Sequence, residues 1–282
     1  LIECDSSLSL IEPLYILFLD KNPAAQQKSY SNFYLIREGA QVTIVEKQIA
    51  DLKTTKKQEL NIFSNWFLEN NATLTYYSYE SNNKRPDCSI NNSIMLRQMG
   101  NSSASFFWFY WEDGITSNDI EVSLDGEFAA CNLYSASLLL NSTVVNHNIR
   151  MNHNSANCES SQVYKGVFND NSSSNFNSLI YVNKRAQKTS SIQQNNNIIL
   201  SDYASVKSNP QLEIFADDVK CAHGSTIGQI DPKALFYLQS RGIGKELGTA
   251  MLLRGFLSDV IDEVVDLKLK DLVLNKFYKL LK

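Results

Sequence analysis

Residues 169–182 read Asn-Asp-Asn-Ser-Ser-Ser-Asn-Phe-Asn-Ser-Leu-Ile-Tyr-Val, which is an Asn- and Ser-rich turn followed by a short β-forming run. Similar runs, separated by clusters of Asn, Ser, Asp or Gly, extend from Leu14 to about Ile230. The stacked coils of a parallel β-helix accommodate Asn and Ser at such turns, although no fixed-length repeat stands out. The pattern therefore favours a parallel β-helix, with a sandwich or a barrel as the alternatives.

The run Phe-Phe-Trp-Phe-Tyr-Trp at residues 106–111 is apolar on both faces of the strand that it predicts. We expect one face of that sheet to be covered by another layer or by a partner, because a bare apolar face of this size is unusual on a soluble protein. Within the β region, one stretch, Glu59–Asn70, is predicted to be helical.

The chain becomes helical from Asp231, where Asp231-Pro232 combines an N-cap residue with proline at the first helical position. We expect this helix to end near Arg241, before Gly242. Two further helices are predicted from about Lys245 to Val265 and from Leu267 to Leu281. The predicted apolar face of the middle helix consists of Leu247, Met251, Phe256, Val260, Ile261 and Val264.

Two interpretations of this helical region remain open at this point. The helices can form a cap that closes the end of the β region. Alternatively, they can form a docking platform for another protein, because three short helices carry more apolar surface than they can bury among themselves.

Composition narrows the function classes. The 282 residues include 26 basic and 30 acidic ones, a net charge of −4, which argues against a general nucleic-acid binder. No apolar run is long enough to span a membrane. Five scattered cysteines without a CxxC motif favour a reducing compartment, either the cytoplasm or a plastid stroma. The first residue is Leu, so we expect a fragment or a processed chain.

The chemistry-bearing residues are concentrated in Ala216–Thr226, since Walker A, HExxH, GxSxG and GxGxxG motifs are missing from the sequence. On an extended strand Cys221 and His223 project from the same face, and together they form a soft pair of ligands suited to iron, zinc or copper(I). Lys220 or a charged His223 is expected to lower the pKa of the thiol. The alternative is a half-buried strand whose histidine is hydrogen-bonded within the chain.

A series of blocks between His147 and Phe256 resembles the SufB/SufD family of SUF iron–sulfur cluster assembly proteins. The blocks are Gln162–Gly166, Ala186–Thr189, Gln193–Leu200, Pro210–Ile214, Asp217–Gly224, Ile227–Gln229 and Leu235–Ile243. Their common order makes the resemblance specific. The Cys-x-His-Gly form of the central block is similar to the SufD branch, since SufB-like chains tend to carry a Glu-His-Glu type of sequence there.

The resemblance implies a right-handed parallel β-helix over residues 1–230 and a C-terminal helical domain over residues 231–282, with the family's N-terminal helical domain absent or truncated. It implies a non-catalytic scaffold subunit that pairs with SufB through the β-helices and docks the SufC ATPase, without binding nucleotide itself. A transient iron–sulfur cluster would form at the SufB interface. There His223 matches the family's candidate ligand, and Cys221 matches the neighbouring cysteine. The matching SufC-docking residues are Leu235, Phe236, Tyr237, Arg241 and Phe256.

Two other functions compete with this interpretation. A homodimer without SufB would bring two copies of Cys221 and His223 together and supply four ligands. A carbohydrate-active β-helix enzyme would instead need carboxylates clustered along one groove. The adjacent Asp217 and Asp218 would face opposite sides of a strand and cannot act as an acid–base pair.

Overall fold

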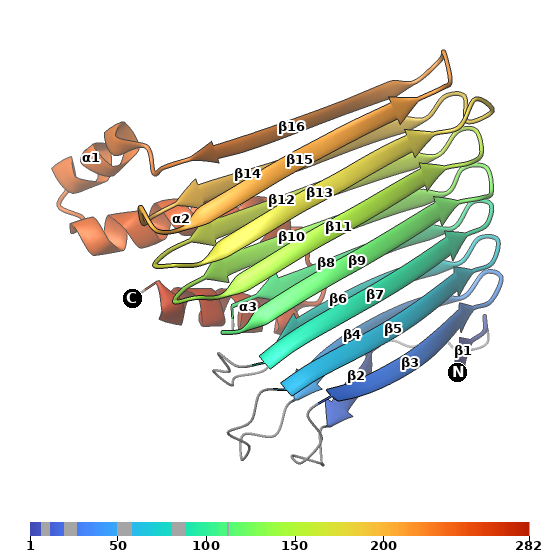
Figure 1. Cartoon of the computed structure of the whole chain (residues 1–282), viewed down its shortest axis with the longest axis horizontal. Helices are drawn as coiled ribbons and strands as arrows, with labels where there is room; N and C mark the ends of the chain where they lie inside the picture. The colour runs from blue at the N-terminus through green and yellow to red at the C-terminus, as the bar shows by residue number, and fades with distance from the viewer. Residues whose placement is uncertain (7–11, 20–26, 50–57, 81–87, 112, 282) are drawn as a thin grey trace.

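The computed structural model describes residues 1–6, 12–19, 27–49, 58–80, 88–111 and 113–281, which form a parallel β-solenoid followed by helices (Figure 1). Successive strands alternate between two eight-stranded sheets within these residues, so each coil contributes one strand to each sheet. The β-helix predicted from the Asn-rich turns is confirmed, and the sandwich and the barrel are excluded.

Both sheets are parallel throughout the described residues, and their strands pair in register. The first sheet contains, in spatial order, β1 (Ile2–Cys4), β3 (Gln27–Ile36), β5 (Gln58–Leu68), β7 (Cys88–Gln98), β9 (Ile115–Leu124), β11 (Val144–His153), β13 (Ser173–Val182) and β15 (Ser205–Ile214). The second contains β2 (Leu14–Leu19), β4 (Gln41–Ile49), β6 (Thr73–Glu80), β8 (Ser103–Tyr110), β10 (Ala130–Leu139), β12 (Glu159–Phe168), β14 (Ser190–Ile199) and β16 (Lys220–Gly228). Equivalent side chains therefore stack in columns from coil to coil.

Asparagine recurs at the turns because it tolerates the left-handed backbone conformation. Asn71, Asn101, Asn141 and Asn157 occupy this region, with φ between 56° and 60°. A short side chain that bonds to the nearby backbone makes this conformation cheaper for Asn than for most residues. The tight turns thus account for Asn at these positions, whereas other asparagines, such as Asn118 and Asn146, lie on strands.

The predicted helix at Glu59–Asn70 is wrong, because this stretch forms strand β5. Ile62, Ser64, Trp66 and Leu68 are buried, whereas the residues between them are more exposed. That alternation has the period of two expected for a strand. Trp66 stacks on Tyr34 of β3 with ring centres 3.7 Å apart, so a contact with the neighbouring coil stabilises the strand.

The helices are α1 (Pro232–Ser240), α2 (Lys245–Ile261) and α3 (Leu267–Leu280). The predicted N-cap is confirmed, since the Asp231 carboxylate accepts a hydrogen bond from the Lys233 backbone N–H at 2.9 Å. None of the helices in the described part of the chain combines the length and the apolar character needed to cross a bilayer.

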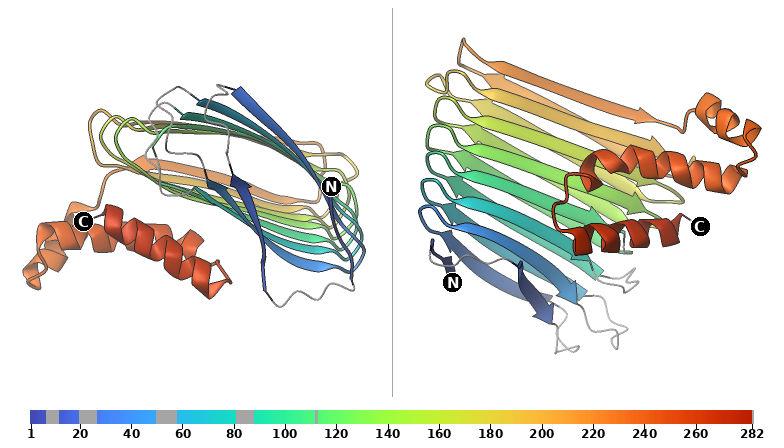
Figure 2. Two further views of the ribbon diagram at one scale, coloured as in Figure 1. Left: turned by 90° about the horizontal axis from the view of Figure 1, so that it is seen from below. Right: turned by 180° about the vertical axis from the view of Figure 1, so that it is seen from behind.

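Helices α2 and α3 lie along the outer face of the second sheet (Figure 2), so the interpretation as a cap over the solenoid end is wrong. Phe107, Phe109 and Trp111 point outward into this layer and pack with the apolar side of the helices. The prediction that the doubly apolar run at residues 106–111 requires a covering layer is confirmed. The apolar side of the helices and the outer face of the second sheet cover each other, and this contact removes both apolar surfaces from water.

The face of α2 that packs on the sheet differs partly from the predicted one. Its buried residues include Leu253 and Leu257 together with the predicted Val260 and Ile261. The predicted Leu247 and Met251 remain about half exposed, at 52% and 46%. Helical spacing alone leaves two adjacent apolar stripes on this helix, and only contact with the sheet selects between them.

Candidate functional site

The residues singled out by sequence lie on β16, which forms the last edge of the second sheet (Figure 1). In register, Cys221 pairs with Ser191 of β14, and His223 pairs with Gln193. Ser191 and Gln193 are completely buried in the solenoid interior. Cys221 and His223 continue these two inward-facing columns onto the final coil, so they share one face at the open end of the solenoid.

The open end leaves these two groups accessible to different degrees. His223 is exposed, whereas Cys221 is half-buried and packs against the solenoid core. Within the described residues, the ring of His223 has no hydrogen-bond partner. The alternative of a histidine that is hydrogen-bonded inside the chain is therefore not what this structure shows. Ser225, the next inward residue, bonds to Ser208 of β15 at 2.8 Å and links the two edge strands.

The pKa of the Cys221 thiol is shifted in the direction opposite to the one expected from sequence. Burial raises the pKa of its thiol, and the Ser191 backbone N–H opposes this shift only in part. Lys220, expected to lower this pKa, is exposed on the opposite face of the strand. In the isolated chain the thiol is therefore held in its protonated form at neutral pH.

A chain of hydrogen-bonded side chains that sequence reasoning missed lies beneath Cys221. Ser191 and Ser160 are joined through their hydroxyl oxygens at 2.7 Å, and Ser160 contacts Nε2 of His153 at 2.9 Å. These residues come from three strands, β14, β12 and β11, so no local motif reveals them. The only sequence signal is that each is a polar residue at an inward-facing position.

The other two histidines are interior residues. Burial lowers the pKa of His147 to about 3 and that of His153 to about 4, which keeps both rings neutral at physiological pH. The described residues contain no group of three or more His, Cys, Asp and Glu side chains placed to hold a metal ion. Cys221 and His223 are thus a pair of donors rather than a complete coordination shell.

Most of the predicted docking residues lie on α1. Phe236 and Tyr237 are 71% and 58% exposed. The guanidinium of Arg241 lies 5.2 Å from the centre of the Tyr237 ring and donates a 3.2 Å hydrogen bond to its hydroxyl. Leu235 is half-buried. Phe256, by contrast, belongs to α2 and packs against the sheet, with the Lys165 Nζ atom 4.6 Å from its ring centre.

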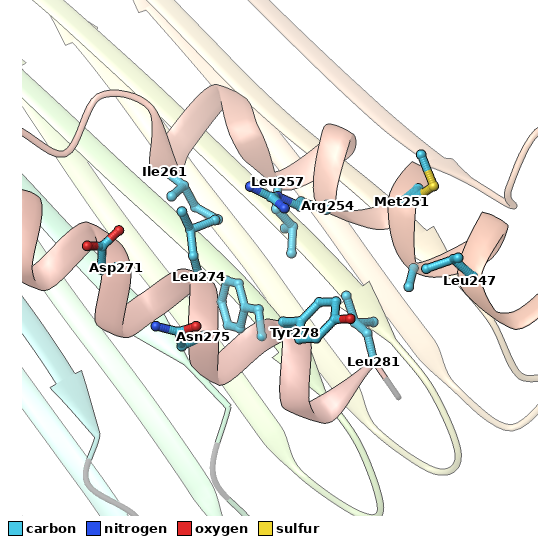
Figure 3. A pocket seen from close by; sticks show the side chains of 12 residues that line it. Leu247, Met251, Arg254, Leu257, Ile261, Asp271, Leu274, Asn275, Tyr278 and Leu281 are labelled. Carbon is cyan, nitrogen blue, oxygen red and sulfur yellow. The ribbon is translucent and has the colours of Figure 1, made fainter.

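The structure also shows a groove between α2 and α3 that the sequence did not indicate (Figure 3). It has a volume of about 500 Å³, and its lining is mostly apolar with one charged residue from each helix, Arg254 and Asp271. Leu247 and Met251, which belong to the predicted apolar face of the middle helix, are among the residues that line it.

Comparison with known proteins places this geometry in a family. Residues 21–256 match the family described as "SUF system FeS cluster assembly, SufBD core domain". The chain is 28% identical to the iron–sulfur cluster assembly protein SufD of Escherichia coli, over 94% of its own length and 62% of that relative. It is also 28% identical to SufD of Bacillus subtilis, over 79% and 51% of the two chains.

A third relative is a SufBD family protein of Synechocystis, to which the chain is 25% identical over 92% of its length and 58% of the relative. The chain thus spans between half and two thirds of the length of these three relatives. The family match includes the last coil with Cys221 and His223, all of α1 and most of α2.

Proposed function

This chain is a SufD-type member of the SufBD core family of the SUF iron–sulfur cluster assembly system, and we propose that it acts there as a scaffold that pairs with a SufB-type partner through its last coil. The observation that carries the proposal is the placement of Cys221 and His223 on the inward face of an exposed terminal strand. The nascent cluster is the cargo of this site, and the scaffold itself turns over no substrate.

Strands β15 and β16 support pairing with another β-solenoid. Each is the last strand of its sheet in the described residues, and β16 is exposed along most of its length. A terminal strand with unpaired N–H and C=O groups is a template for adding another strand. A partner solenoid docked at this end would convert the exposed edge into an interior and bring its own side chains opposite Cys221 and His223.

The ligand chemistry also favours a shared site. Iron–sulfur clusters are usually held by four protein ligands, and this chain offers one thiol and one imidazole. The partner would supply the remaining donors. A thiol must lose its proton to bind iron, and the pKa of Cys221 is raised. Cys221 would therefore become a ligand only when a positive charge beside it, either the incoming iron or a cationic group of the partner, stabilises the thiolate.

The helical end would receive the SufC-type ATPase. Phe236 and Tyr237 of α1 and the C-cap residue Arg241 form an exposed aromatic and cationic surface, a composition typical of binding hot spots. Phe256 would act indirectly by holding α2 on the sheet. Since α2 and α3 are packed along the second sheet, a force applied to them by ATP-driven dimerisation of SufC would be transmitted to the strands that include β16.

This coupling can be tested through the reactivity of Cys221. In the assembled complex, ATP should increase the rate at which a thiol reagent modifies Cys221, and a SufC variant unable to bind ATP should leave that rate at its resting value. An unchanged rate in the ATP-competent complex would exclude the coupling.

The test of the assembly is native mass spectrometry of this chain co-expressed with SufB- and SufC-type proteins under anaerobic conditions. We expect one copy of this chain, one SufB and two SufC in the complex. A stable homodimer that ignores SufB would replace the proposal by a symmetric site with two Cys221–His223 pairs. A monomer that binds neither protein would refute the scaffold role.

A further inference from the structure

A buried amide lies directly below His223. Gln193 of β14 pairs in register with His223 of β16, and both occupy the same inward-facing column. The residue one coil further down in this column is Gln162 of β12. Both glutamines are completely buried. The column is therefore polar where it approaches the candidate site, although its lower members Phe106 and Leu133 are apolar.

The amide of Gln193 is held by hydrogen bonds on one side only. Its Nε2 group donates to Gln162 Oε1 at 3.2 Å and to the hydroxyl of Ser178. Ser178 in turn donates to Gln162 Oε1 at 2.8 Å. The Oε1 atom of Gln193, in contrast, is buried without a hydrogen-bond partner among the described residues. An unpaired buried acceptor costs about 1–3 kcal/mol, so its retention at this position requires an explanation.

His223 is the donor best placed to satisfy this acceptor. Neighbouring strands lie about 4.8 Å apart, which is within reach of two long side chains that stand in the same column. The adjacent columns offer Cys221 above Ser191 and Ser225 above Asn195, and Ser225 is already bonded to Ser208.

We propose that Gln193 is a positioning residue for His223: the ring, which is unbonded among the described residues, turns inward and donates one N–H to Gln193 Oε1. This inference rests on the proposed function of the last coil. A neutral imidazole carries one N–H donor and one lone pair. Directing the N–H inward fixes the tautomer and leaves the lone pair of the other nitrogen free to bind iron or another soft metal at the open end. Metal-binding histidines commonly use their second nitrogen in this way.

The choice of an amide rather than a carboxylate has a chemical consequence. A carboxylate below His223 would stabilise the imidazolium, which cannot bind a metal. The carbonyl oxygen of Gln193 carries no charge, so it orients the ring without favouring the protonated form. The hydrogen bonds from Gln193 to Ser178 and Gln162 keep that oxygen directed away from the lower coils.

The direct test is the tautomer of His223, measured from ring ¹⁵N chemical shifts of the histidine-labelled full chain at pH 8. The variant His223→Ala identifies the signals. We expect one predominant tautomer in the unmodified chain and a mixture of both tautomers in Gln193→Met. Gln98→Met is the matched control, since it removes an equally buried amide whose Nε2 group donates to Ser102 and Ala130, several coils away from β16.

Three results would overturn the proposal. They are mixed tautomers in the unmodified chain, an unchanged ring spectrum in Gln193→Met, and equal changes in Gln193→Met and Gln98→Met. If Gln193→Met does not fold, Gln193→Asn keeps a buried amide but withdraws the acceptor by one methylene. The same loss of the single tautomer is expected there.

A second readout separates this inference from the proposed function. In the co-expressed complex, Gln193→Met should lower the anaerobically measured cluster content about tenfold while leaving the subunit composition of the complex unchanged. Normal cluster content despite mixed tautomers would refute the positioning role. If the unmodified chain forms no complex and holds no cluster, the proposed function fails, and the tautomer experiment still decides whether Gln193 orients His223.

Discussion

Lys165, on the outer face of β12, forms an ion pair with Asp259 of α2. The lysine side chain is only 8% exposed, whereas that of the aspartate is 63% exposed. The same ammonium group lies over the ring of Phe256. Since β12 pairs with β14, and β14 with β16, this contact fastens the helical layer to the sheet that ends in the candidate site.

Because the two side chains differ so much in exposure, we expect replacement of one or the other to lower the free energy of unfolding by different amounts. Asp259→Ala leaves the Lys165 charge buried without its counter-ion and should lower the free energy of unfolding by about 1–3 kcal/mol. Lys165→Met leaves Asp259 in contact with water and keeps an apolar contact with Phe256, so the loss should stay below about 1 kcal/mol. Urea denaturation measures both changes, and equal losses would contradict the assignment.

The buried carboxylate of Glu46 predicts a pH-dependent stability. Desolvation raises its pKa, although hydrogen bonds from Tyr34 and from Tyr76, the latter at 2.6 Å, oppose this effect. Since the folded-state pKa lies above the unfolded value, the native state binds more protons in the interval between the two. The stabilising contribution of the protonated form is full below the unfolded pKa and is lost as pH rises through the folded pKa.

We therefore expect Glu46→Gln, which keeps the polar contacts without an ionisable group, to gain stability relative to the unmodified chain as pH rises above about 4.5. Each unit of pKa difference corresponds to about 1.4 kcal/mol. Urea denaturation at pH 4.5, 6 and 7.5 gives the comparison. A difference in free energy of unfolding that is constant across these three pH values would contradict a raised pKa.

The proposed role of His223 as a ligand is separable from stability, because the side chain is exposed. His223→Ala should change the free energy of unfolding by less than about 0.5 kcal/mol, yet it should lower the cluster content of the complex. Lys220→Ala is the matched control, since Lys220 lies on the opposite face of the same strand. Loss of folding, or of binding to the proposed SufB-type partner, in His223→Ala would identify the residue as structural.

The proposed docking surface around α1 is tested with Phe236→Asp, because this ring is 71% exposed and its replacement costs little core packing. We expect at least a tenfold loss of SufC affinity by calorimetry, with an unchanged thermal midpoint. Leu267→Asp is a control of similar exposure, 73%, at the start of α3. Normal SufC binding by Phe236→Asp would remove the docking assignment. Phe256→Asp should instead destabilise the chain, since that ring packs on the sheet.

Local sequence patterns predicted the repeating strands, the Asn-rich turns and the three helices. The reason is that strand alternation, left-handed turn residues and helix caps depend on residues close together along the chain. The same patterns misassigned Glu59–Asn70, where the partner of Trp66 lies in another coil. They also selected Leu247 and Met251 for burial on α2, since periodicity cannot show which of two apolar stripes meets the sheet.

For the candidate site, the sequence by itself determined which chemical groups are present: a thiol and an imidazole two residues apart, on one face of a strand. The tertiary structure decided their surroundings. Parallel stacking in register placed Ser191 and Gln193 beneath them and left β16 as a terminal strand. Register between coils is set by packing of the whole interior, so it depends on residues from every neighbouring strand and is not encoded in any short segment.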